Sequence, residues 1–200
     1  MTLLIAGLLL FLGVHSLRIL AEPWRNDVIA RIGVHRFRGV YSLLAIAGLW
    51  MLVQGYGTAR WSSTALYHPP EWTHYLTIAL MLPAMILFVA TYLPGTRIKR
   101  FTGHPMMLGT RIWAGAHLLS NGRVADVLLF GSLFAWALFA HHAARARDRV
   151  AGASAPEVGP WSRDLIALSA AVVLWAAIIL WLHQLIGVMP LLPPGMQLSF

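Results

Sequence analysis

The sequence predicts an all-α membrane protein: a polytopic bundle of about six transmembrane helices with both chain ends on the extracytoplasmic side. Three observations predict this fold, namely the composition, a series of long apolar runs, and the alternation of basic residues between loops. Hydrophobic residues make up 58% of the 200-residue chain and charged residues only 11%, against about 45–50% and about 25% in soluble domains. The mean hydropathy is +0.69. The length suits a single membrane domain over residues 1–200.

Six apolar runs are candidate spans. They lie at about residues 2–20, 39–57, 74–93, 105–120, 124–144 and 165–187. Most reach the roughly 20 residues that a helix needs to cross a hydrocarbon core about 30 Å thick. The first run carries its first charge, Arg18, at its far end. This order is the reverse of that in a cleavable signal peptide, so we expect the run to be retained as a helix.

Basic residues are concentrated in every second loop, after the first, third and fifth runs. They are Arg25, Arg31, Arg36, Arg38, Arg97, Lys99, Arg100, Arg145, Arg147, Arg149 and Arg163. The loop after the second run carries only Arg60, and the turn after the fourth only Arg123. Because Lys and Arg gather in cytoplasmic loops, this alternation predicts an even number of spans. It also accounts for the net charge of +8 without a nucleic-acid partner.

The fourth run has local signals at both of its ends. Pro105 suits the first turn of a helix, and Asn121-Gly122 suits a helix end followed by a tight reversal. The helix between them has about 16 residues and a length of roughly 24 Å, which is short for a bilayer. We expect it to form a hairpin with the fifth span.

Three polar side chains make this helix unusual in lipid. His104 stands at its start, as an interfacial residue or as part of a binding site. His117 lies deeper, where polar groups usually face the bundle interior, which favours a functional role. Arg111 has no acidic residue at its depth. Its guanidinium either snorkels about 10 Å to head groups or binds an anion such as a haem propionate or a phosphate, and both interpretations stay open.

His15 is a third intramembrane histidine, late in the first run. Two neutral imidazoles in an apolar bundle are a common way to hold a haem. His104 and His117 stand about 20 Å apart on one helix, whereas trans-axial nitrogens on one iron are about 4 Å apart. A bis-histidine site must therefore draw on two spans, and depth alone leaves the partner of His15 open. The histidines at span ends, such as His141, are weaker candidates.

The pair His15-Ser16, the arginine-bearing loop after it and the stretch GHPMMLGTRIWAGAHLLSNG together resemble the NnrU family. This bacterial membrane family is associated with denitrification and nitric-oxide reductase expression, and it is similar to the zeta-carotene isomerases, which carry haem b. The resemblance covers nearly the whole chain. It implies that His15 and His117 match the haem ligands, that His104 matches a further shared histidine, and that the protein lies in the bacterial inner membrane.

A wider similarity runs to isoprenylcysteine and phospholipid methyltransferases, whose Arg-His-Pro-x-Tyr-x-Gly motif helps to bind S-adenosylmethionine. Gly103 stands in place of that arginine and Met107 in place of that tyrosine. Methyl transfer is therefore not expected.

Three functions follow as alternatives. The first is a haem-b protein of nitric-oxide metabolism, acting as an accessory or redox-sensing factor with a redox partner. The second is a haem-dependent isomerase of a polyene or another lipid-soluble molecule. The third is a membrane carrier without a cofactor that uses Arg111 for an anion. A visible absorption spectrum separates the first two from the third.

Overall fold

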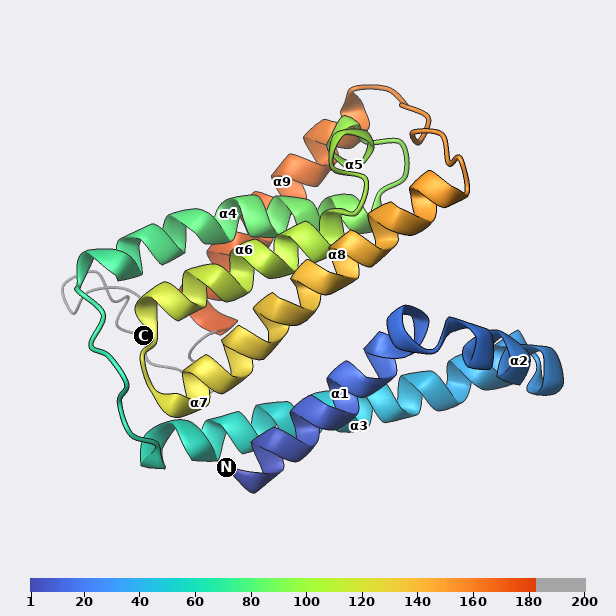
Figure 1. Ribbon diagram of the computed structural model, residues 1–200. Coiled ribbons are helices and arrows are strands. Elements are labelled where there is room, and N and C mark those ends of the chain that lie inside the picture. The colour runs from blue at the N-terminus through green and yellow to red at the C-terminus, as the bar shows by residue number, and fades with distance from the viewer. Residues whose placement is uncertain (183–200) are drawn as a thin grey trace. The chain divides into compact units, whose positions relative to one another are not determined.

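The computed structural model describes residues 1–182, and helices cover 82% of them, with no strand in that part of the chain. In chain order the elements are α1 (Thr2–Leu20), α2 (Glu22–Ile32), α3 (Val34–Ser62), α4 (Trp72–Tyr92), α5 (Arg97–Thr102), α6 (Pro105–Ser120), α7 (Val124–Asp126), the π-helical turn η1 (Val127–Gly131), α8 (Ser132–Val150), α9 (Ser162–Ala177) and the π-helical turn η2 (Ile178–Leu182) (Figure 1). The prediction of an all-α fold is confirmed for these residues.

Five helical segments of the described chain are long and apolar enough to cross a bilayer. They cover residues 2–20, 34–62, 72–92, 124–150 and 162–181, and each overlaps one predicted span. The remaining predicted span is α6, which begins and ends at the predicted residues. With 16 residues it is shorter than the roughly 20 that a perpendicular crossing needs. The last predicted span ends at residue 187, so its final residues lie outside the described part.

Part of the predicted loop after the first span is helical. The helix α2 has no buried residue and exposes Trp24 to 54%. The next helix, α3, begins at Val34 rather than at residue 39 and ends at Ser62 rather than at residue 57. Polar residues flank the apolar centre of α3. They are helical, although hydropathy alone does not predict that the helix extends over them.

The chain divides into two compact units. Unit 1 comprises residues 1–68 and 121–136, and unit 2 comprises residues 69–120 and the chain from 137 onward. The boundary therefore falls inside α8, between Trp136 and Ala137.

Within unit 1, α1 and α3 run antiparallel in close contact (Figure 1). Glycines make the approach possible. A Cβ added at Gly7 would stand 2.7 Å from the backbone nitrogen of Leu52, and one at Gly48 would stand 2.9 Å from that of Phe11. Small residues at helix contacts are typical of membrane bundles, because they let the backbones come close enough for van der Waals packing.

A buried carboxylate lies at one end of unit 1. Asp126 is 4% exposed, and the hydroxyl of Tyr56 donates to it at 2.7 Å. The backbone N–H of Arg123 donates to its second oxygen at 2.9 Å, while the Arg123 guanidinium donates to the carbonyl of Ser63 at 2.8 Å. These bonds satisfy the buried acid and join the loop after α3 to the start of α7.

Unit 2 is built on α4, which packs against both α6 and α9. Met81, Ala84 and Ala116 form its buried core. The hydroxyl of Thr77 donates to the carbonyl of Ala116 at 2.8 Å. Pro83 lies inside α4, and a proline frees the carbonyl four residues before it. The indole of Trp175 donates, at 2.9 Å, to the neighbouring carbonyl of Ile78.

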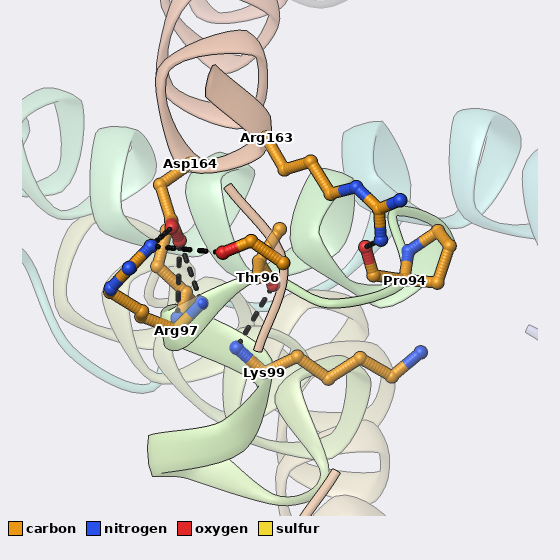
Figure 2. Close-up of polar contacts among 8 residues, drawn as sticks. Pro94, Thr96, Arg97, Lys99, Arg163 and Asp164 are labelled. Atoms are coloured by element: carbon orange, nitrogen blue, oxygen red, sulfur yellow. Dashed lines mark hydrogen bonds and ion pairs between the residues drawn. The ribbon is translucent and has the colours of Figure 1, made fainter. Parts of the chain in front are cut away.

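A polar latch joins the start of α9 to the α4–α5 turn in unit 2 (Figure 2). The carboxylate of Asp164 accepts from the backbone N–H of Arg97 at 2.8 Å and from its guanidinium at 3.1 Å. The same guanidinium lies over the ring of Trp161, 3.5 Å from its centroid. Thr96 caps α5 by accepting from the N–H of Lys99 at 3.1 Å. These contacts order the basic segment after α4, which the sequence analysis places on the cytoplasmic side.

Candidate functional site

His15 lies on α1 in unit 1 and is surrounded by aromatic rings. Its Nδ1 lies 2.7 Å from the carbonyl oxygen of Phe11, one turn earlier. The ring centroids of Phe11, Tyr41 and Trp136 stand 4.2, 5.5 and 5.8 Å from that of the imidazole. The indole nitrogen of Trp136 is buried and has no hydrogen-bond partner among the described residues. Unit 1 therefore holds a half-buried imidazole in an aromatic environment, with an N–H donor nearby.

His117 repeats this local arrangement on α6 in unit 2. Its Nδ1 lies 2.8 Å from the carbonyl oxygen of Trp113, also one turn earlier, and the two rings are 5.0 Å apart. A carbonyl oxygen can only accept, so Nδ1 carries the proton in each histidine and Nε2 carries the lone pair of the neutral ring. Metal-ligating histidines are oriented in the same way, with the second ring nitrogen donating to a carbonyl or carboxylate.

His104 has a different environment. Its Nε2 lies 2.7 Å from a carboxylate oxygen of Asp148, near the end of α8. Its ring centroid is 6.1 Å from that of His141, which lies about two turns before Asp148 on α8. The side chains of His104 and Asp148 are 28% and 46% exposed. His104 therefore makes a contact between helices, and its partner is the carboxylate of Asp148.

Arg111 lies deeper on α6 than His104. Its Nε is buried and has no hydrogen-bond partner among residues 1–182. The Nδ1 of His141 is buried without a partner in the same part of the chain. Arg111 is one of the groups whose charge acts on His141. The two unpartnered nitrogens thus belong to one cluster of unit 2.

The four residues predicted from the sequence do not all come together. His104 and Arg111 share the cluster with His141, whereas His117 is near the far end of α6. That helix is continuous from Pro105 to Ser120, so the separation of about 20 Å between His104 and His117 holds and the two cannot bind one iron. His15 belongs to unit 1.

The sequence did not single out His141, Asp148 or Trp136. In the sequence His141 and Asp148 stand at the end of a span among arginines, and no spacing motif marks them. These residues could be found only by aligning the two antiparallel helices α6 and α8. That alignment depends on the conformation of the chain between them, which the sequence does not reveal.

Within residues 1–182, no group of three or more His, Asp or Glu side chains could hold a metal ion. A haem iron takes only one or two ligands from the protein, because its macrocycle supplies the others.

A family model described as "NnrU protein" matches residues 3–190 of the chain. No curated protein sequence and no solved structure is significantly similar to it.

Proposed function

Because the chain belongs to the NnrU family, we propose that it is a haem-b-binding protein of the bacterial inner membrane, with His15 and His117 as the iron ligands. The observation that carries the proposal is their shared geometry. Each imidazole lies within hydrogen-bond distance of the carbonyl one turn earlier, through Nδ1, which leaves Nε2 as the atom suited to iron.

The side chains around these two histidines also suit a haem. Haem presents a large apolar surface, and aromatic rings lie beside both imidazoles. The backbone hydrogen bonds fix each ring's tautomer and orientation and raise the basicity of Nε2. When bound, haem b would supply a redox-active iron that can take small gaseous ligands. The family's association with denitrification then favours an accessory or redox-sensing role in nitric-oxide metabolism.

The proposal includes a topology of six spans with both chain ends outside the cytoplasm. The five long helices and the alternation of basic loops support it, provided that α6 crosses as well. Its 16 residues span about 24 Å, and a short helix is accommodated by local thinning of the bilayer or by packing against its neighbours.

The test is the absorption spectrum of detergent-purified protein from haem-replete cells. We expect a Soret band and a pyridine-haemochrome signal of haem b. Each of the variants His15→Gly and His117→Gly should lose or shift the band, and added imidazole should restore it by filling the vacated position. His74→Gly is a control, since His74 is exposed at the start of α4. Wild-type protein without a Soret band would rule out the proposal.

A further inference from the structure

The cluster around Arg111 in unit 2 has two buried nitrogens without hydrogen-bond partners in the described chain. Arg111 comes from α6 and His141 from α8, and a side-chain nitrogen of each is buried without a partner in the described chain. A buried polar atom that lacks a hydrogen-bond partner is unfavourable, and more so when the group is charged. A site with two such atoms is therefore incomplete without a further group.

The charges of this cluster indicate the sign of the missing group. The titratable groups that act on His141 are all bases, namely Arg111, His104, Arg145 and His142. The one carboxylate found at the cluster, that of Asp148, already lies against His104 at 2.7 Å. Positive charge is thus in excess around the two buried nitrogens, and an anion would balance it.

The geometry also argues against simple snorkelling of Arg111. A snorkelling arginine extends its whole head group to the interface, whereas the Nε of Arg111 is enclosed by protein. The planar guanidinium presents its N–H groups as a fork, which matches the two oxygens of a carboxylate or phosphate.

We propose that Arg111 and His141 form an oxyanion site, which takes the carboxylate or phosphate head of an amphiphile whose apolar part lies in the bilayer. The Arg111 fork binds two oxygens, and the Nδ1–H of His141 donates to one of them. A haem propionate and the head group of a free lipid-like acid are two sources of this same chemistry. The site itself does not depend on haem.

The first experiment uses haem-free protein in a neutral detergent and follows thermal unfolding by tryptophan fluorescence. The probes are oleate and methyl oleate, which differ in the charged head, and inorganic phosphate at constant ionic strength. We expect oleate or phosphate, but not methyl oleate, to raise the unfolding midpoint, because a ligand that binds only the native state stabilises it. Equal shifts with oleate and methyl oleate, together with no effect of phosphate, would overturn the proposal for a free acid.

Variants then test the two residues. Arg111→Leu should weaken binding of the anion by about tenfold or more, since a charge-assisted hydrogen bond is lost. His141→Phe keeps the ring but removes the donor, and it should weaken binding by a smaller factor. Arg149→Leu removes an exposed charge from the same helix and should leave binding unchanged. If Arg111→Leu does not fold, Arg111→Lys retains the charge without the fork and should show an intermediate affinity.

A second experiment tests whether the anion bound at Arg111 is a haem propionate. Protein is titrated with haem b and with haem b dimethyl ester, in which both propionates are blocked. Weaker binding of haem b to Arg111→Leu, with unchanged binding of the ester, assigns the site to the propionate. If the chain binds no haem but oleate still acts through Arg111, the haem proposal fails and the oxyanion site stands. If Arg111→Leu changes neither anion nor haem binding, the oxyanion site is wrong.

Discussion

The imidazole of His104 lies 2.7 Å from the carboxylate of Asp148, although the two residues are 44 positions apart in the chain. This contact joins the start of α6 to the end of α8 within unit 2. It places an acid and a base next to the buried nitrogens of Arg111 and His141.

We expect the His104–Asp148 contact to contribute little to stability by itself. Both side chains are partly exposed, at 28% and 46%, and water and salt screen such pairs to about 1 kcal/mol or less. A double-mutant cycle with His104→Ala and Asp148→Ala, read by thermal unfolding, measures this coupling. A coupling of several kcal/mol would mean that the pair is far better shielded than its exposure indicates.

The contacts of Asp164 with Arg97 should contribute more to stability than the His104–Asp148 contact does. The carboxylate of Asp164 is 9% exposed and accepts from the backbone and the guanidinium of Arg97. Replacing it with alanine leaves the partly exposed Arg97 guanidinium and backbone N–H groups without their acceptor, at a cost of about 1.5–3 kcal/mol. Asp164→Asn keeps one acceptor oxygen and should cost less. Glu157 is an exposed acid of the loop before α9, so Glu157→Gln is the matched control and should leave the unfolding midpoint unchanged.

The close contact of α1 and α3 gives a prediction with an internal control on the same helix. A Cβ at Gly48 would meet the backbone of Phe11 at 2.9 Å, and backbone cannot move aside without separating the helices. We expect Gly48→Ala to destabilise the protein by about 1–3 kcal/mol. Gly57 has nothing within 4 Å of the same added atom. Gly57→Ala should therefore stabilise the helix by about 0.5–1 kcal/mol. Equal effects of the two variants on thermal unfolding would contradict this account of the interface.

The ends of α6 could be predicted from the sequence because their signals are local. Pro105 suits the first turn of a helix, and Asn121-Gly122 suits a helix end, so the bounds Pro105–Ser120 follow from neighbouring residues. The outer turns of α3 could not be predicted in this way. Their residues are polar, and helix continuation there depends on the hydrogen-bonded backbone rather than on hydropathy.

The partner of His104 could not be predicted because it depends on the register of a reversal. A hairpin symmetric about Gly122 would place residue 140 (2 × 122 − 104) opposite His104. The observed partner, Asp148, lies eight residues further along (148 − 140 = 8). The chain passes through α7 and the π-helical turn η1 before α8 begins. A π-helical turn inserts a residue into the helical repeat, and neither segment has a signal that hydropathy would reveal.

The crossing of the membrane by α6 can be tested with single cysteines, because the chain has none of its own. Phe101, which is 90% exposed, lies before α6, and Arg123 lies after it. If α6 spans the bilayer, an impermeant maleimide will label Phe101→Cys from the cytoplasmic side and Arg123→Cys from the opposite side. Arg31→Cys and Glu71→Cys provide the reference for each side, because both exposed residues precede α6 in the chain. Labelling of Phe101→Cys and Arg123→Cys from the same side would leave an odd number of spans and place the two chain ends on opposite sides of the membrane.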